Sequence, residues 1–359
     1  MRRALAITLF ATALAVAGCG GGKSAPTRVS GGGATFVDPL MQKWSGEYKT
    51  AKGVEIDYVA KGSGYGISNV TSKNIEFGCT DAPMNAKEVD AAKTAGGEVI
   101  HVPVTIGAVA IIYNLPGVSG LKLNGEVLAD IYLKKLTTWN DPRIAALNPG
   151  VNLPGAPIGP VRRKESSGTT NIFTEYLSKR SAEFATSPGT SKDPKWPEGV
   201  EGKPENAGIA EHVKNTPNAI GYVELAFARK NGIPFATLVN NAGKAVAPDA
   251  ASVTAAVDSA MKVKQEKEPY SLHPLSFSFT DADGDAAYPI VGASYAILFK
   301  KQAKDKGPAI VAFLMWAVTD GQKFAADLQY APLPAKVVSK IEDRLKSLRS
   351  GDKKFLSGA

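Results

Sequence analysis

The sequence has few of the residues that build metal sites and disulfide frameworks. Its 359 residues include only two cysteines and three histidines. The histidines, at positions 101, 212 and 273, show no suggestive spacing to one another or to a candidate serine nucleophile. No Cys/His cluster has the spacing of zinc ligands, and two cysteines cannot form a disulfide framework. The composition therefore argues against a zinc enzyme and against a small disulfide-rich scaffold.

Long apolar stretches are also scarce, since the chain has only one, over residues 4–17. This run is shorter than the roughly 20 residues that a membrane-spanning helix needs. Arg2 and Arg3 precede it as a short basic head, which is the pattern of a secretory signal peptide. We therefore predict a signal peptide over residues 1–18. The rest of the chain is expected to be soluble and to lie outside the cytoplasm.

The apolar run ends in Val-Ala-Gly-Cys, which resembles the lipobox of bacterial lipoproteins. In such proteins the cysteine becomes the first mature residue and carries lipid, so Cys19 is a candidate lipidation site. Residues 19–26 then read as a flexible tether because they are rich in glycine. An ordinary signal peptide with an incidental Cys19 is the alternative. Either way the domain is expected outside the cytoplasmic membrane, in contact with it through a lipid anchor only.

The charge balance is mildly positive, with a formal net charge of +8 at pH 7. Lysine and arginine are spread along the chain, and aromatic residues do not interleave with a basic stripe. This pattern gives no indication of nucleic-acid binding. A positive balance of this size can steer small anions.

Alternating strand and helix patterns predict an α/β fold. Residues 54–60, 100–113, 219–223 and 288–299 are expected to form strands. Helices are expected to start at Leu128 and to occupy 207–213, 309–319 and 335–348. The proline-rich stretch 181–206 is expected to be a surface loop. The chain is long enough for two domains of typical size.

The most informative segment runs from residue 162 to residue 177. Two arginines, Arg162 and Arg163, come shortly before a Ser-Gly-Thr step at 167–169, which opens an expected helix. A helix start presents free backbone N–H groups and the positive end of the helix dipole. An arginine adds a fork that fits a tetrahedral oxyanion. The segment predicts an anion site, although plain capping by the hydroxylic residues is the alternative.

Two glycine-rich turns also predict anion binding. Residues 31–36 lead into an expected helix with Thr35 at the N-cap position, and Leu40, Trp44 and Tyr48 share one face of that helix. Residues 62–66 follow an expected strand and begin a second helix, with Ser63 near its start. Strand, glycine-rich turn and helix start together make an anion cradle. Neither turn matches the P-loop or the dinucleotide-binding pattern.

Asp81 is an acidic residue among these anion-binding signals. It precedes Pro83, so it is a candidate helix cap. A carboxylate can also accept a proton from a protonated anion. Phosphate still carries a proton at neutral pH, whereas sulfate does not. A buried Asp81 would therefore pair with phosphate and repel sulfate, a discrimination of about 10⁴–10⁵ in comparable sites.

These motifs, in this order, make the chain resemble the phosphate-binding proteins of phosphate-specific ABC transporters. The motifs that carry the resemblance are residues 31–36, 62–64, 77–83, 162–163 with 167–169, and 219–224. The resemblance covers nearly all of the chain after the tether. It implies that phosphate is held by Thr35, Phe36, Ser63, Asp81, Arg163, Ser167, Gly168 and Thr169. Phe36 would contribute its backbone N–H.

The sequence departs from that family at one position near Arg163. Relatives carry an aspartate two residues after this arginine, which orients it, and this chain has Glu165. The longer side chain can still reach Arg163, so Glu165 is expected to support the arginine from outside the ligand contacts. The other departure, Cys79 and Thr80 in place of Ala-Ser, is expected to be harmless.

The resemblance also implies an architecture and partners. The fold would be a two-lobed periplasmic-binding-protein fold of type II-like topology, with a ligand cleft between two α/β domains joined by a hinge. Domain I would comprise residues 27–110 and 287–359, and domain II residues 111–286. The partners would be inorganic phosphate and the permease subunits of an ABC transporter with its cytoplasmic ATPase. The protein is expected to be a monomer without cofactor, metal or enzymatic activity.

Three alternatives stay open at the level of sequence. A phosphatase would need a metal cluster or an activated nucleophile. The acidic segment 281–285 hints at a calcium loop, but its glycine is misplaced, and we interpret it as an acidic turn. A binding protein for another oxyanion such as arsenate is the second alternative, because arsenate also keeps a proton. A surface receptor that keeps the fold is the third.

Overall fold

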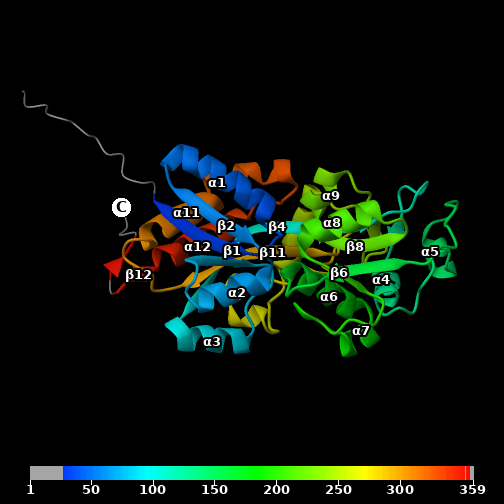
Figure 1. Ribbon diagram of the computed structural model, residues 1–359, viewed down its shortest axis with the longest axis horizontal. Coiled ribbons are helices and arrows are strands. Elements are labelled where there is room, and N and C mark those ends of the chain that lie inside the picture. The colour runs from blue at the N-terminus through cyan, green and yellow to red at the C-terminus, as the bar shows by residue number, and fades with distance from the viewer. Residues whose placement is uncertain (1–26, 352, 356–359) are drawn as a thin grey trace, which may run out of the picture.

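The computed structural model describes residues 27–351 and 353–355, which form a mixed α/β structure around one long sheet (Figure 1). The sheet has eight strands in the order β2-β1-β3-β11-β4-β8-β6-β7. Their bounds are β1 Arg28–Gly33, β2 Glu55–Ala60, β3 Phe77–Thr80, β4 Val99–Tyr113, β6 Gly159–Arg163, β7 Glu201–Lys203, β8 Ala219–Glu224 and β11 Val291–Phe299.

Strand β4 joins the two halves of the sheet. Its residues 99–108 pair with β11, and its residues 109–113 pair with β8. The second half, made of β8, β6 and β7, is therefore displaced along β4 from the first half, made of β2, β1, β3 and β11. Strands β1, β2 and β3 are parallel to one another, whereas β6 and β8 run in the opposite direction. The carboxyl ends of β6 and β8 consequently face those of β1–β3. We call the region between them, where β4 changes partner from β11 to β8, the junction.

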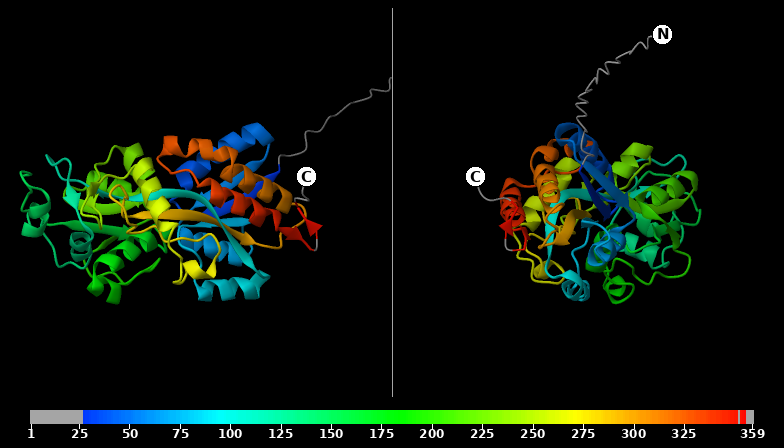
Figure 2. Two further views of the ribbon diagram at one scale, coloured as in Figure 1. Left: turned by 180° about the vertical axis from the view of Figure 1, so that it is seen from behind. Right: turned by 60° about the vertical axis from the view of Figure 1, so that its left-hand side comes forward.

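Helices cover both faces of the sheet in each half (Figures 1 and 2). In the view of Figure 1, α1 lies above the first half and α2 and α3 lie below it, whereas α8 and α9 lie above the second half and α6 and α7 below it. The helices are α1 Asp38–Lys52, α2 Ser63–Thr71, α3 Ala86–Gly96, α4 Gly125–Tyr132, α5 Pro142–Leu147, α6 Gly168–Arg180, α7 Ala182–Thr186, α8 Glu205–Asn215, α9 Leu225–Asn231, α10 Ala250–Ala260, α11 Gly307–Val318 and α12 Ala335–Lys346.

The remaining elements are short. Strands β5 Lys122–Leu123, β9 Thr237–Val239 and β10 Ala245–Val246 form a three-stranded sheet, and β12 Arg349–Ser350 pairs with β13 Lys353–Lys354. Three 3-10 helices occupy Tyr270–Leu272, Asp320–Phe324 and Ala326–Leu328. Across the two described stretches of chain, no helix combines the length and apolar character needed to cross a bilayer.

Local sequence explains where the principal elements begin and end. Helix α1 buries Leu40, Trp44 and Tyr48, the face predicted from their spacing, and ends at Gly53, whose φ of 68° favours glycine. Asn85 caps α3 through a capping box with Glu88. Strand β4 is buried along its length after its first residue, as expected for a central strand covered on both faces.

Most sequence-predicted elements are confirmed within a few residues, and three expectations are wrong. The helix expected to start at Leu128 instead ends at Tyr132, because Asn124 caps its true start. Thr35 is not the N-cap of α1, since the helix begins at Asp38 and Val37 occupies that position. The stretch 181–206 is not simply a surface loop, because it contains α7 and β7 and buries Asn206 completely.

Candidate anion-binding site

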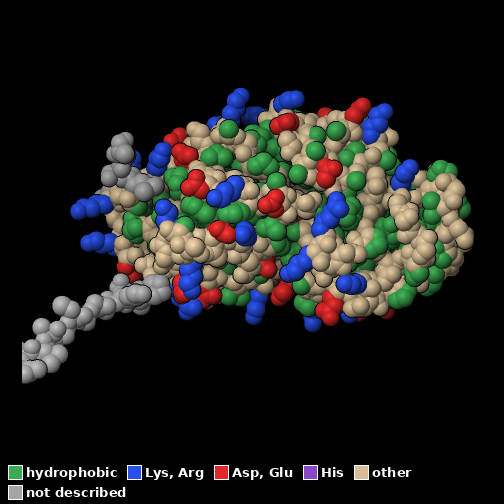
Figure 3. All heavy atoms as spheres, turned by 90° about the horizontal axis from the view of Figure 1, so that it is seen from above, with side chains coloured by type: hydrophobic (Ala, Val, Ile, Leu, Met, Phe, Trp, Pro, Cys, Tyr) green, Lys and Arg blue, Asp and Glu red, His purple; other side chains and the backbone are tan. Residues whose placement is uncertain are grey.

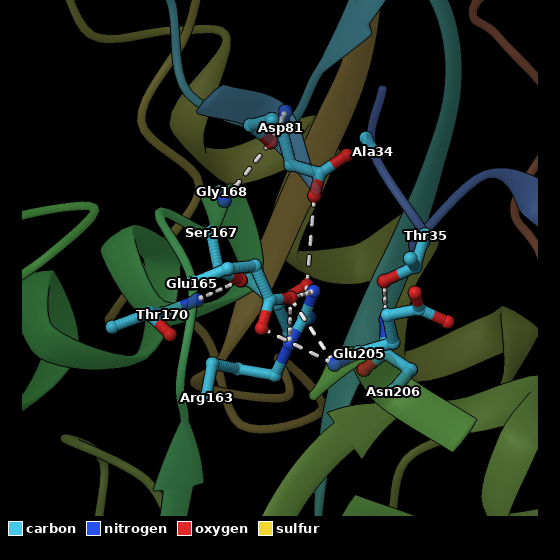
Figure 4. A network of polar contacts seen from close by, with 12 residues as sticks. Ala34, Thr35, Asp81, Arg163, Glu165, Ser167, Gly168, Thr170, Glu205 and Asn206 are labelled. Atoms are coloured by element: carbon cyan, nitrogen blue, oxygen red, sulfur yellow. Dashed lines mark hydrogen bonds and ion pairs between the residues drawn. The ribbon is translucent and has the colours of Figure 1, made fainter. Parts of the chain in front are cut away.

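The predicted anion-binding residues lie at the ends of strands that face one another across the junction. Thr35 and Phe36 follow β1, Ser63 follows β2, and Asp81 directly follows β3. Arg163 is the last residue of β6. Ligands of open α/β sheets bind outside the carboxyl ends of strands, where helices begin. Figure 4 shows Thr35, Asp81 and Arg163 approaching one another from these separate segments.

Two helices begin at the site with the residues that the sequence indicated. Helix α2 starts at Ser63, with Gly62 as its N-cap at a φ of 93°. Helix α6 starts at Gly168, and the Ser167 side chain caps it by accepting a hydrogen bond from the Thr170 N–H. Both starts place partial positive charge at the junction. Capping and anion binding are thus compatible at α6. The Ser167 hydroxyl oxygen accepts the capping bond, and its O–H group can still donate to an anion.

Ser63 connects the two sides of the site. Its Oγ accepts hydrogen bonds from the Gly168 N–H at 2.9 Å and from the Asp81 N–H at 3.2 Å. A side chain at position 168 would collide with Asp81 and with the Ser63 hydroxyl, since an added Cβ would lie 2.6 Å from both. Glycine is therefore required where the α6 start meets the first half of the sheet. Next to this contact, the Gly64 N–H donates to the Ser166 carbonyl oxygen at 3.1 Å.

Asp81 is buried and bonded on both oxygens. Ser294 Oγ donates to Oδ1 at 2.8 Å, and Thr169 Oγ1 lies 3.5 Å from Oδ2. Burial raises the pKa of Asp81 to about 7, although the hydrogen bond from Ser294 and the charge of Arg163 oppose this shift. The cap prediction for Asp81 is wrong, because α3 begins five residues later and Asn85 caps it. The side chain instead faces the anion-binding residues.

Two histidines whose rings lie against each other hold the segment that carries Asp81. The Met84 N–H donates to His101 Nε2 at 3.1 Å, and His273 Nε2 lies 2.7 Å from the Met84 carbonyl oxygen. The two imidazole rings lie 3.7 Å apart between centroids. Burial lowers the pKa of both histidines, so both are neutral at physiological pH. These residues shape the site from behind and form no nucleophile–base pair.

Arg163 is a buried guanidinium whose orientation is set by Glu165. Its Nε donates to Glu165 Oε1 at 2.8 Å, Nη2 also contacts that oxygen, and Nη1 donates to Thr169 Oγ1 at 3.3 Å. Glu165 is itself held by the Glu205 N–H, 3.2 Å from each carboxylate oxygen. The glutamate thus reaches the arginine despite its extra methylene. Three of the five N–H groups of Arg163 are engaged, which leaves two for an anion.

Thr35 and Phe36 complete the site from the β1 side. Asn206 Nδ2 donates to Thr35 Oγ1 at 2.8 Å, so the threonine hydroxyl keeps its own proton for an anion. Phe36 is fully buried, and its ring packs against Tyr330 with 6.2 Å between centroids. The anchoring of the aromatic ring fixes the backbone that carries the Phe36 N–H.

The two histidines and Glu205 were not predicted from the sequence, and neither were three further residues of the site. These three are Ser294 in β11, Asn206 in α8 and Lys192, whose carbonyl oxygen accepts the Ser167 N–H at 2.9 Å. Lys192 Nζ also lies 2.6 Å from Glu88 Oε2. This ion pair links the segment between α7 and β7 to α3. The only local signal is the small polar side chain of Ser294 within the apolar strand β11, and it does not identify Asp81 as the partner.

The remaining expectations concern metal and lipid. In the part of the chain that the structure describes, no group of three or more His, Cys, Asp or Glu side chains could hold a metal ion. Asp281 of the acidic segment pairs with Arg180, in agreement with an acidic turn. Cys79 is a buried free thiol. Cys19 and the expected signal peptide lie outside the described residues.

Comparisons with known proteins place this arrangement in a family. The family described as "PBP superfamily domain" matches residues 21–321. A phosphate-binding protein PstS of Pasteurella multocida is 39% identical over 332 residues, 91% of this chain and 93% of its own length. A PstS protein of Xylella fastidiosa is 39% identical over 319 residues, 88% of this chain and 84% of its own.

A solved structure supports the same assignment at the level of the fold. A high-affinity periplasmic phosphate-binding protein with bound phosphate superposes with a TM-score of 0.71 at 21% identity, covering 88% of this chain and 93% of that chain. The predicted α/β, two-lobed binding-protein fold is thereby confirmed. With a matching superfamily domain and close relatives over nine-tenths of its length, the chain belongs to the PBP superfamily and, within it, to the family of PstS phosphate-binding proteins.

Proposed function

We propose that this protein binds inorganic phosphate between the strand ends described above and delivers it to the permease of an ABC transporter. The observation that carries the proposal is a buried carboxyl group, Asp81, beside a buried guanidinium, Arg163, with helix starts and hydroxyl groups around them. This combination supplies positive charge and donors together with one acceptor. Phosphate is the common anion that needs both.

The proposed ligands are those carried over in the sequence analysis. Arg163 supplies charge and two free N–H groups, and Asp81 accepts the proton of the anion. The Thr35 and Ser63 hydroxyls and the backbone N–H groups of the two turns supply the remaining donors. Thr169 places its hydroxyl between Arg163 and Asp81. The complete set is Thr35, Phe36, Ser63, Asp81, Arg163, Ser167, Gly168 and Thr169. Glu165 stays outside it and orients Arg163, as its hydrogen bonds support.

Closure of two domains around the anion is part of the proposal. The sheet partners of β4 change between residues 108 and 109, which supports a boundary near residue 110. Thr35, Phe36, Ser63 and Asp81 would belong to domain I, formed by 27–110 and 287–359. Arg163 and residues 167–169 would belong to domain II, formed by 111–286. An anion that bridges both domains stabilises the closed state, because only that state offers all contacts.

Location and anchoring are proposed from the sequence. The basic head, the apolar run and Cys19 support export and a lipid anchor, with the protein on the outer side of the cytoplasmic membrane. On the face seen in Figure 3, basic and acidic side chains are interspersed, and that face carries no continuous basic stripe. The permease and its ATPase are the proposed macromolecular partners of a monomeric binding protein.

The phosphatase alternative has no support in the site. The relatives are named as binding proteins, and the histidines near Asp81 bind the backbone of Met84 and contact no hydroxyl nucleophile in the described residues. Arsenate, by contrast, has the same shape and also keeps a proton, so it stays a candidate second ligand.

Calorimetric titration of the mature domain tests the proposal. The protein is unfolded and refolded first, so that carried-over anion is removed, and phosphate, sulfate and arsenate are then titrated separately at pH 8.5. We expect one phosphate per chain, no heat with sulfate, and binding of arsenate. A folded protein that binds no phosphate would overturn the proposal.

The pH dependence of selectivity is a second expected result. Because the pKa of Asp81 is raised to about 7, the ligand-free side chain is ionised at pH 8.5 and mostly neutral at pH 5.5. A neutral carboxyl can donate a hydrogen bond to sulfate, whereas an ionised one repels it. Sulfate affinity of the wild type should therefore rise as the pH falls through 7. Competition of sulfate against labelled phosphate at several pH values measures this, and a flat profile would contradict it.

A further inference from the structure

Glu224 is a buried carboxyl group at the junction that the proposed function does not use. It is the last residue of β8 and the N-cap of α9, and it has no exposed surface. Its Oε2 accepts the Ala226 N–H at 2.9 Å and lies 3.1 Å from the Tyr330 hydroxyl. Its Oε1 is buried without a hydrogen-bond partner among the described residues. An ionised carboxylate in this position would be poorly compensated.

Counting protons on Tyr330 indicates which form Glu224 takes. The Tyr330 hydroxyl lies 2.6 Å from the Phe36 carbonyl oxygen, which can only accept, so the single hydroxyl proton is used there. The contact between Tyr330 and Glu224 then needs a proton from Glu224. Burial, with a smaller contribution from Asp81, raises the pKa of Glu224 well above its usual range, in agreement with this assignment. A neutral Glu224 donates to Tyr330, which donates to Phe36.

A second chain of hydrogen bonds starts at the backbone of the same residue. The Glu224 N–H donates to Asn206 Oδ1 at 3.1 Å, and Asn206 Nδ2 donates to Thr35 Oγ1 at 2.8 Å. The direction of these bonds orients the Asn206 amide and leaves the Thr35 hydroxyl proton free. The two chains of hydrogen bonds thus lead from Glu224, at the end of β8, to the adjacent residues Phe36 and Thr35, which follow β1.

We propose that Glu224 is a positioning residue of the phosphate site. As a neutral carboxylic acid, its side chain holds the Phe36 backbone through Tyr330, while its backbone N–H orients Asn206 and thereby Thr35. The inference rests on the proposed phosphate site. Glu224 touches no anion itself. It fixes the backbone at Phe36 and the hydroxyl at Thr35 in the orientation that donates to the anion, and it adds no second negative charge beside Asp81.

The test compares three variants with the wild type by phosphate titration at pH 8.5. Glu224→Gln keeps a neutral side chain whose amide N–H can take over the donation to Tyr330, although that nitrogen cannot also accept the Ala226 N–H. Because the path to Phe36 is kept, its affinity should stay within about threefold of the wild type. Glu224→Met and Tyr330→Phe each break the chain to Phe36 and should weaken binding by about tenfold, the cost of a buried polar group left without its partner. Glu211→Gln, an exposed change on α8, is the matched control.

Each outcome bears on the inference. Equal losses for Glu224→Gln and Glu224→Met would show that a neutral donor to Tyr330 does not support binding, and would overturn it. Unchanged affinity in Tyr330→Phe would also overturn it, and this variant keeps the aromatic ring if Glu224→Met fails to fold. Infrared difference spectra of wild type against Glu224→Gln, recorded without phosphate at pH 7, should contain the band of a protonated carboxyl. That readout separates failure of this inference from failure of the phosphate proposal.

Discussion

Replacing Arg163 by methionine is expected to lower phosphate affinity by about 10²–10⁴-fold. The guanidinium is buried, and two of its N–H groups remain for the anion after those bonded to Glu165 and Thr169. Each charge-assisted hydrogen bond contributes about 1.5–3 kcal/mol, and each 1.4 kcal/mol is a factor of about ten in affinity. The loss also removes the positive charge that offsets Asp81.

Titration calorimetry of Arg163→Met against the wild type checks this expectation. Lys164→Met removes the same charge from the next, exposed residue and is the matched control, which should bind phosphate within about threefold of wild type because exposed charges are screened. Glu165 keeps its hydrogen bonds from the Glu205 N–H in the variant, so the fold is expected to persist. Binding reduced equally in both variants would indicate general electrostatic attraction in place of a specific contact.

Replacing Asp81 by asparagine is expected to change selectivity more than affinity. In the wild type at pH 8.5, Oδ2 has to accept a proton from the anion, and sulfate has none to give. The asparagine Nδ2 donates, while its Oδ1 still accepts from Ser294. Discrimination between phosphate and sulfate should fall from about 10⁴–10⁵ to less than about 10². Phosphate affinity should change by less than about tenfold, because the variant loses one acceptor but also loses the repulsion between the carboxylate and the anion.

Parallel titrations of both anions at pH 8.5 and pH 5.5 decide the role of Asp81. The variant should bind sulfate at both pH values, because asparagine does not titrate. Asp90→Asn, an exposed change on α3, should leave the selectivity of the wild type intact. An Asp81→Asn protein that binds phosphate and still ignores sulfate would show that another group selects the anion.

The parts of the site that are local in sequence could be predicted from the sequence. The helix starts at Ser63 and Gly168 follow from a strand, a small-residue turn and an apolar helix face, all within about fifteen residues. The two N-cap expectations that failed, at Thr35 and Asp81, did so because these residues face the junction. A better cap, Asn85, lies further along the chain at α3, and α1 begins without a side-chain cap.

The parts that depend on distant pairing could not be predicted. Ser294 reaches Asp81 only because β11 inserts between β3 and β4. Asn206 looked like a loop residue, since a proline-rich sequence surrounds it, and its burial follows from its contacts with Thr35 and with the Glu224 backbone. No local pattern encodes these partners. The resemblance to a family supplied the ligand set, but it did not supply the residues that hold the ligands in place.

The position of β11 has a consequence for the order in which this chain folds. Residues 291–299 lie in the middle of the sheet, between strands that end at residues 80 and 113. The half of the sheet made of β2, β1, β3 and β11 cannot be completed until about five-sixths of the sequence has been synthesised. Pairing over such sequence separations is slow, because the loop must be closed before contacts form. Synthesis of the amino-terminal half alone therefore leaves β3 and β4 without the strand that joins them, so the sheet is completed late.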